Sequence, residues 1–299
     1  MTARGARDGP GAAGAASQDA PLPVAPLAAP LAAAIQLDSR DDEAGNFARV
    51  EALCAQARAR GARLVALPEN VLYEGPDGGR RHPLETWGPR FGALARALEV
   101  TLVAGSVREP VPGDPARAWN TTVAYGPDGA ALARYRKIHL FDVDVPGGPV
   151  ERESDVVAPG RDVVVFEAPG LGPVGLAICY DLRFPELFRA LADRGARLVV
   201  LPSSFAAATG RAHWEVLVRA RAIEDQLWVV APDQAGLKPH GRPKYGHSMI
   251  VDPWGTVVAR AREVEEDVVV AALDLAQQDR VRAAMPVLAH RRPLPPAAG

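Results

Sequence analysis

The sequence contains only two cysteines, Cys54 and Cys179, among its 299 residues. Two cysteines do not make a disulfide framework, and neither lies in a Cys-x-x-Cys motif or beside a close histidine pair. No stretch of the sequence approaches the ~20 apolar residues that a membrane helix requires. We therefore expect no bound metal, no membrane partner and a cytoplasmic protein.

An excess of charge of one sign is also missing, since 34 Lys and Arg are balanced by 36 Asp and Glu throughout the chain. Without a basic stripe to neutralise phosphates, nucleic acid is not an expected partner. A Gly-x-Ser-x-Gly elbow is absent, which argues against a serine hydrolase. The string Gly170-Leu-Gly-Pro-Val-Gly175 matches a dinucleotide-binding fingerprint, but it leads into a strand rather than a helix, so we predict a turn there.

The hydrophobic content, 48% of the residues, is enough to bury the core of one large domain. Residues 1–30 are rich in Ala, Pro and Gly and lack the apolar core of a signal peptide. We predict a disordered leader there, with a cleaved transit peptide as the alternative. The expected domain covers residues 31–293, and residues 294–299 are expected to form a flexible C-terminus.

An internal repeat indicates a duplicated α/β fold. Arg60-Gly-Ala-Arg-Leu-Val-Ala-Leu-Pro68 recurs as Arg194-Gly-Ala-Arg-Leu-Val-Val-Leu-Pro202, and each copy follows a segment with helical spacing of apolar residues. At a similar offset, Tyr125-Gly-Pro-Asp-Gly129 is echoed by Val251-Asp-Pro-Trp-Gly255, a turn between two strand-like runs. Chance repetition in an Ala- and Arg-rich chain is the alternative for the short hairpin strings.

Polar side chains follow the repeated strands. Glu69 comes directly after the first copy, and Ser203 and Ser204 come after the second, so pseudo-symmetry predicts that both loops lie at one rim. Cys179 ends a third apolar run, 173–178. The pattern also predicts strands over 31–37, 101–107, 121–125, 131–135, 163–166, 228–231, 248–251, 256–259 and 268–273, and helices over 46–60, 86–98, 185–194, 213–225 and 275–284.

Three of these residues supply the groups needed to cleave an amide. Cys179 precedes Tyr180-Asp-Leu-Arg-Phe-Pro-Glu186, and Lys137 lies in Tyr135-Arg-Lys-Ile-His-Leu-Phe-Asp142. A free thiol with a pKa near ~8.5 is mostly protonated at neutral pH, so a carboxylate such as Glu69 is needed as its base. The ammonium of Lys137 and the backbone N–H of Tyr180 could stabilise the oxyanion. Considered alone, the Cys179 thiol would more often be a buried core residue, which we expect of Cys54.

These residues resemble the nitrilase superfamily of carbon–nitrogen hydrolases, whose catalytic Glu, Lys and Cys match Glu69, Lys137 and Cys179. The resemblance covers about residues 31–293. It implies an α/β fold, a four-layer αββα sandwich of two mixed sheets, and a homodimer, with no cofactor. A second glutamate of the family, which positions the lysine and the substrate, matches Glu153.

Further motifs, including Tyr245-Gly-His-Ser-Met249 and Asp252-Pro-Trp-Gly-Thr256, are similar to the deaminated-glutathione amidase and omega-amidase type. This implies cleavage of a small linear amide, deaminated glutathione or a related 2-oxo acid amide, to carboxylate and ammonia through a cysteine thioester. An N-carbamoyl amino acid hydrolase and a non-catalytic binding module are the alternatives. Two segments depart from the type, Asn70–Gly75 and the C-terminal residues 294–299.

Other residues near the motifs are candidates for support or substrate binding. Arg183 and Lys244 are candidate anchors for a substrate carboxylate. We expect Trp214 to form a wall of the pocket and His213 to be structural. Tyr180, Arg183 and Phe184 are also expected supports, for which helix capping or packing is the alternative. Ser203 is expected to support the site or bind the substrate as well.

Overall fold

The computed structural model describes residues 29–76, 80–145, 150–262 and 266–292. Nearly all of the expected leader and all of the C-terminal segment 294–299 lie outside these ranges. Within them, no helix is both long enough and apolar enough to cross a membrane.

The first half of the chain, together with β16 from near the C-terminus, forms an eight-stranded mixed sheet in the order β16-β1-β2-β3-β5-β4, with β6 and β9 also paired to β5. The strands β1, β2 and β3 run parallel, whereas β16 is antiparallel to β1 and β5 is antiparallel to β3, β4 and β6. The elements are β1 (Leu31–Gln36), α1 (Glu43–Ala59), β2 (Ala62–Ala66), α2 (Leu84–Leu98), β3 (Thr101–Val103), β4 (Val107–Val111), β5 (Asp114–Tyr125), β6 (Ala131–Arg136), β9 (Val157–Ala158) and β16 (Asp267–Ala272).

The second half forms a six-stranded mixed sheet in the order β10-β11-β12-β13-β14-β15. Its helix–strand unit α3–β12 corresponds to α1–β2, and its hairpin β14–β15 corresponds to β5–β6, as the sequence repeat predicts. The elements are β10 (Val165–Ala168), β11 (Gly172–Leu176), α3 (Pro185–Asp193), β12 (Leu198–Val200), α4 (Ala207–Asp225), β13 (Trp228–Ala231), β14 (Met249–Val251) and β15 (Val257–Arg260).

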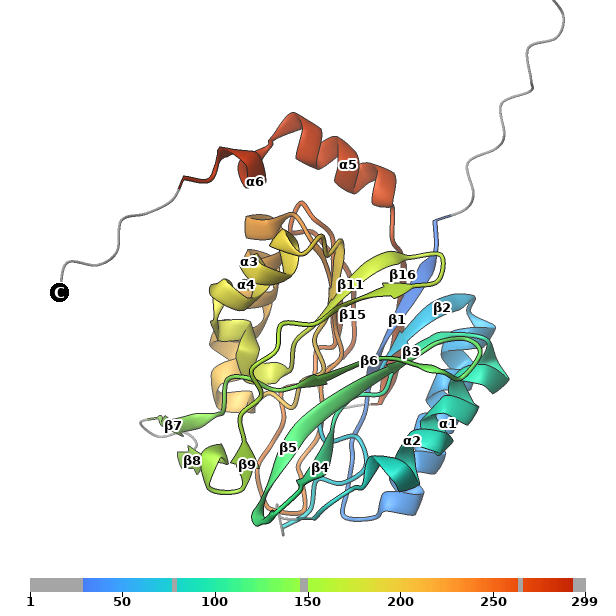
Figure 1. The fold of residues 1–299 in the computed structure, drawn as a ribbon, viewed down its shortest axis with the longest axis vertical. Helices are drawn as coiled ribbons and strands as arrows, with labels where there is room; N and C mark the ends of the chain where they lie inside the picture. The colour runs from blue at the N-terminus through green and yellow to red at the C-terminus, as the bar shows by residue number, and fades with distance from the viewer. Residues whose placement is uncertain (1–28, 77–79, 146–149, 263–265, 293–299) are drawn as a thin grey trace, which may run out of the picture.

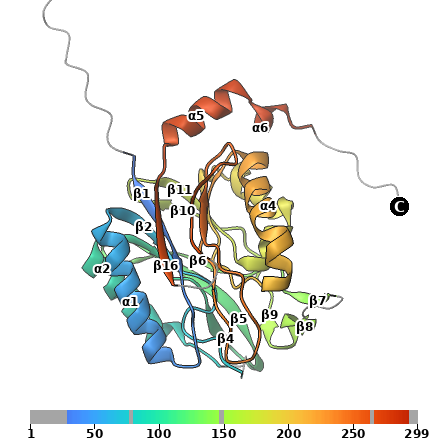
Figure 2. The same cartoon turned by 180° about the vertical axis from the view of Figure 1, so that it is seen from behind.

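The two sheets face each other, with α1 and α2 outside one sheet and α3 and α4 outside the other (Figure 1). Alternation along β1 explains the layers. Ala32 and Ala34 join the core between the sheets, and Ala33 and Ile35 pack in the core beneath α1 and α2. The predicted αββα sandwich is therefore confirmed. The C-terminal helices α5 (Leu275–Ala284) and α6 (Val287–His290) lie at one end of it (Figure 2).

Several boundaries differ from the expectations. The helix expected from residue 213 begins at Ala207, and the strand expected over 173–178 ends at Leu176. The edge strand β4 and the first part of β5 were not predicted, because Pro110 and several charges interrupt their apolar pattern. The small hairpin of β7 (Asp142–Asp144) and β8 (Val150–Arg152) was also missed. The turn predicted for residues 170–175 is confirmed only at Gly170 and Leu171, in the β10–β11 hairpin, because Gly172 to Gly175 already belong to β11.

Candidate active site

Cys179 opens a single 3-10 turn, Cys179–Arg183, that follows β11. Its φ of 47° lies in the left-handed region, which is unfavourable for a residue with a side chain. The backbone N–H of Cys179 donates to the Pro202 carbonyl at 2.9 Å, next to the end of β12. This bond ties the strained turn to the neighbouring strand and fixes the direction of the thiol.

The loop after β2 carries Glu69 to the same place. Its backbone N–H donates to the Ser203 carbonyl at 3.2 Å, and its own carbonyl accepts from Gln234 Nε2 at 2.9 Å. The loops that follow the two repeated strands therefore meet across the two sheets. This confirms the prediction of a common rim.

Lys137, just after β6, lies between two buried carboxylates. Its Nζ is 3.1 Å from Glu69 Oε1 and 2.8 Å from Glu153 Oε2. Glu153 also accepts the backbone N–H of Phe141 at 2.7 Å. The structure thus brings together all four residues that the sequence proposed for the chemistry, Glu69, Lys137, Glu153 and Cys179.

Asn120, on β5, is a residue of this cluster that the sequence reasoning missed. Its Nδ2 donates to Glu69 Oε1 at 2.7 Å and lies 3.3 Å from Glu153 Oε1. In the sequence Asn120 lies between Trp119 and Thr121, one residue before the strand expected over 121–125, and nothing there marks it as functional. In the structure it is fully buried, and a buried amide requires partners. Asn120 holds the two carboxylates in a fixed relation to Lys137.

The charges of the cluster stabilise one another. Although burial opposes it, Lys137 and Arg108 lower the pKa of Glu153 to about 2. The carboxylates of Glu153 and Glu69 raise the pKa of Lys137 in spite of its burial. Burial, together with the charge of Glu69, raises the pKa of the Cys179 thiol, and Lys137 opposes this. The resting site therefore holds a protonated thiol beside an ionised lysine.

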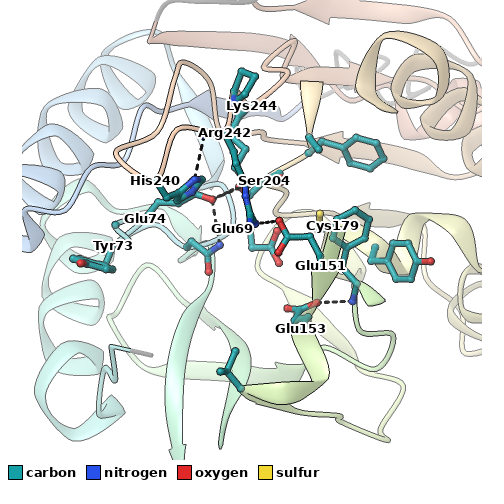
Figure 3. Close-up of a pocket in the computed structure, with 18 of the residues that line it drawn as sticks. Glu69, Tyr73, Glu74, Glu151, Glu153, Cys179, Ser204, His240, Arg242 and Lys244 are labelled. Atoms are coloured by element: carbon teal, nitrogen blue, oxygen red, sulfur yellow. Dashed lines mark hydrogen bonds and ion pairs between the residues drawn. The ribbon is translucent and has the colours of Figure 1, made fainter. Parts of the chain in front are cut away.

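A cavity of about 710 Å³ is lined by Glu69, Lys137 and Cys179. Figure 3 shows Glu69 and Cys179 among the side chains that surround it. Its lining also includes Tyr180 from the turn after the thiol and Glu153. In the described part of the chain, no group of three or more His, Cys, Asp and Glu could hold a metal ion. The cavity offers a thiol, a base and an ammonium to a ligand.

The other expected supports lie outside the cavity lining. Phe184 stacks on His139 with ring centroids 3.7 Å apart, and the Ser203 hydroxyl donates to the Leu201 carbonyl. The guanidinium of Arg183 lies 3.2 Å from His213 Nδ1. These residues support the loops around the thiol by packing and hydrogen bonding. Arg183 therefore does not occupy the position of a substrate anchor.

The expectation that Trp214 forms a wall of the pocket is wrong. Trp214 is fully buried, packs against Phe205 and donates its indole N–H to the His247 carbonyl at 2.9 Å. Its spacing on α4 places it on the face that packs on the sheet. The indole therefore belongs to the core behind the site.

Asp181 connects the turn of the nucleophile to the strand that precedes Lys137. The carboxylate is fully buried and accepts the Ile178 backbone N–H at 2.9 Å, the Tyr135 hydroxyl at 2.6 Å and the His139 backbone N–H at 3.1 Å. Ile178 precedes the thiol, and the other two donors flank Lys137. Asp181 therefore fixes the thiol relative to the lysine.

Lys244, one of the two expected anchors for a substrate carboxylate, lines the cavity. Its Nζ is 3.1 Å from Glu74 Oε1 and 3.3 Å from the Ser204 carbonyl. Glu74, in the unusual segment Asn70–Gly75, also accepts the Ser204 hydroxyl and lies 3.6 Å from Lys238. Although burial opposes it, Glu74 raises the pKa of Lys244, so the cation is held ionised at the cavity.

A family model described as carbon–nitrogen hydrolase matches residues 31–283. The chain therefore belongs to the carbon–nitrogen hydrolase family and is an enzyme of that class, which confirms the resemblance to the nitrilase superfamily.

Named relatives lie close to it in sequence. The chain is 41% identical to the deaminated glutathione amidase of Synechocystis sp., over 87% of this chain and 97% of that protein. It is 38% identical to the omega-amidase NIT2 of Homo sapiens, over 87% of this chain and 94% of that protein. The solved structure of the C. elegans NitFhit protein matches with a TM-score of 0.80 and 37% identity, over 89% of this chain and 65% of that longer one.

Proposed function

We propose that the enzyme cleaves an amide through a thioester on Cys179. The sulfur attacks the carbonyl carbon while Glu69 takes the thiol proton, and Glu69 then donates it to the leaving nitrogen as the C–N bond breaks. Water, deprotonated by Glu69, opens the thioester to the carboxylic acid and the free thiol. The observation that carries this proposal is that Glu69, Lys137 and Cys179 line one cavity.

Lys137 and the backbone N–H of Tyr180 stabilise the oxyanion of both tetrahedral intermediates. Lys137 suits this role because two carboxylates and burial hold its Nζ in place, at 3.1 Å and 2.8 Å from Glu69 and Glu153. Glu153 keeps the ammonium charged while Glu69 changes its protonation state. Glu153 is therefore a positioning residue for Lys137.

The substrate that we propose is a 2-oxo acid amide such as deaminated glutathione. Relatives named for deaminated glutathione and omega-amide cleavage support this class. The cavity lining contains six Lys and Arg against four Glu, which favours an anionic ligand. Lys244 is the proposed anchor for a substrate carboxylate.

The leaving group differs between the two named amides. A primary amide such as 2-oxoglutaramate releases ammonia, whereas deaminated glutathione releases the dipeptide cysteinylglycine. The sequence analysis expects ammonia as the product. Ammonia would be released only from a primary amide, and not from deaminated glutathione. The cavity of about 710 Å³ is of the size that accommodates larger ligands, ~300–1,000 Å³, and so supports the dipeptide conjugate.

A substrate panel tests the reaction. The enzyme is incubated with deaminated glutathione, 2-oxoglutaramate and N-carbamoyl-β-alanine, and the products are identified by mass spectrometry. We expect 2-oxoglutarate from the first two. Turnover of the carbamoyl compound alone, with carbon dioxide and ammonia as products, would show the carbamoyl hydrolase instead.

The thioester is tested by quenching the unaltered enzyme with acid during turnover, because Glu69→Gln would lack the base for acylation as well as for hydrolysis. We expect an acyl adduct on Cys179 after incubation with the same amides. Cys54 is an internal control, because burial raises the pKa of its thiol to about 12 and it is fully buried. An adduct on Cys54 and none on Cys179 would refute the proposed nucleophile.

We also propose that residues 31–293 form a single hydrolase domain that works in the cytoplasm as a homodimer. A free thiol as the nucleophile requires a reducing compartment, and both cysteines are free. Exposed apolar side chains on α4 and the β14–β15 hairpin, Val216 and Trp254 among them, support association of two copies.

A further inference from the structure

A second ion pair at the cavity joins the two halves of the molecule. Arg242, in the loop between β13 and β14, pairs with Glu151 on β8. Both side chains line the cavity, together with the thiol (Figure 3). Their side chains are 54% and 28% exposed, so this pair lies where the cavity meets solvent.

Lys244 and Glu74 form a different kind of pair. Their side chains are only 15% and 6% exposed, and Glu74 is also held by the Ser204 hydroxyl and by Lys238. The charges of Glu69 and Cys179 help to raise the pKa of Lys244, which is consistent with a position of the ammonium near the reacting atoms. The cavity therefore has one cation close to the thiol and another at its solvent-exposed part.

The two pairs differ in how easily a ligand can replace the protein carboxylate. An exposed ion pair contributes little to stability, because water screens it and both side chains lose freedom. A guanidinium also binds a carboxylate through two parallel hydrogen bonds. A ligand carboxylate can therefore take the place of Glu151 on Arg242 at small cost, whereas Glu74 is fixed on Lys244 by its other partners.

We propose that Arg242 exchanges Glu151 for the second carboxylate of a dianionic substrate, and so makes the enzyme prefer amides with a carboxylate at each end. This inference rests on the proposed function and narrows its substrate class. Deaminated glutathione has a carboxylate at both ends, whereas 2-oxoglutaramate has one. Arg242 thus serves as a specificity residue, and Lys244 serves both substrates.

The two variants Arg242→Gln and Glu151→Gln are expected to act in opposite directions. Loss of the guanidinium should raise KM for deaminated glutathione roughly fivefold with little change in kcat, because the contact is made equally in the ground and transition states. Loss of Glu151 removes the competing carboxylate and should lower the same KM about twofold. In both variants, KM and kcat for 2-oxoglutaramate should stay within about twofold of those of the unaltered enzyme.

The dependence of substrate preference on salt concentration tests the role of Arg242, because a purely structural role of Arg242 would not produce it. The preference of the unaltered enzyme for deaminated glutathione over 2-oxoglutaramate should shrink at ~0.5 M salt, because exposed charges are screened. Arg260→Gln is the matched control. Arg260 pairs with Glu215 at 2.7 Å with similar exposure, 49% and 40%, and does not line the cavity. This substitution should leave KM unchanged for both substrates.

Binding to inert Cys179→Ser protein separates this inference from the reaction. We expect calorimetry to give a dissociation constant for deaminated glutathione that rises roughly fivefold on Arg242→Gln, with none of that change for 2-oxoglutaramate. Equal weakening of both ligands, or no weakening of deaminated glutathione, would overturn the role of Arg242. Binding of this kind without turnover by the unaltered enzyme would overturn only the proposed reaction.

Discussion

Single residues in the active site depend on partners that compensate for burial. Cys179 is 8% exposed, and its thiol is kept protonated by burial and by the charge of Glu69. In the proposed reaction, a thiolate therefore forms only as the proton moves to Glu69, while the oxygen of the substrate carbonyl receives the new charge. This coupling protects the nucleophile from reacting in the absence of a substrate.

Asp225, at the end of α4, gives a prediction for the pH dependence of stability. Burial raises its pKa from 3.8 to about 6, although Arg189 lies 2.8 Å away and opposes the shift. The unfolded chain therefore loses this proton at lower pH than the folded protein, so this group lowers stability as pH rises from about 4 to 6.

Asp225→Asn keeps the size of the side chain and removes this titration. The melting temperature of the variant minus that of the unaltered protein should be larger at pH 7 than at pH 4.5. Thermal unfolding followed by circular dichroism at the two pH values measures the difference. An equal effect of the substitution at both values would contradict the assigned titration.

The sequence predicted the residues that interrupt a local pattern and missed those defined by distant partners. Glu69 and Cys179 each follow an apolar run, and Lys137 lies in a motif that places charges between aromatic residues, so all three are visible locally. Asn120 bonds to a residue 51 positions away, and Glu74 bonds to Ser204, 130 positions away. No local pattern contains such pairings, because they arise only when the two sheets pack together.

At the scale of elements, the turn between β3 and β4 positions the loop of Glu69. Gly105 has a φ of +62°, and a Cβ placed there would lie 2.2 Å from the Pro68 carbonyl oxygen. Pro68 directly precedes Glu69, so a side chain at position 105 would push the base out of position. Strand edges and turns such as this one are poorly predicted from sequence, because their charges and prolines resemble those of loops.

We predict that Gly105→Ala lowers both stability and activity. The left-handed backbone alone costs an alanine about 1–2 kcal/mol, and the clash with Pro68 adds to it. Displacement of the base should lower kcat at least ~10-fold in the protein that remains folded. Urea unfolding and kcat of the purified variant are measured.

Gly113→Ala is the control, since Gly113 has a φ of +76° but nothing within 4 Å of the added Cβ. It should lose about 1–2 kcal/mol of stability and keep full kcat. If both variants retained kcat, the link between the turn and Glu69 would have to be abandoned.

For the whole molecule, the outer face of α4 and the adjoining hairpin is the surface on which we expect pairing. Its exposed apolar side chains are Val216, Ile223, Trp254 and Val258, at 66%, 42%, 60% and 41%. Ile223 lies directly beneath the hairpin at Gly255, so the apolar groups are adjacent. Such a patch is stabilised when a second surface covers it.

We predict that sedimentation velocity finds a dimer of the 31.6 kDa chain and that Trp254→Glu converts it to a monomer. A buried carboxylate in an apolar interface is costly, so dissociation should be nearly complete at micromolar concentration. Leu237→Asp, at an equally exposed position of 61% away from this face, should remain a dimer. A monomeric unaltered protein would exclude this mode of assembly.

The two similar halves of the chain have unequal shares in the chemistry. In the proposed reaction, the half built on β1–β6 supplies Glu69 and Lys137 for proton transfer and charge stabilisation, whereas the half built on β10–β15 supplies Cys179 for the covalent bond. The two copies of the repeated unit thus share an architecture, but only the first is followed directly by one of the three proposed catalytic residues. Neither half is a smaller version of the enzyme, and catalysis is a property of their union.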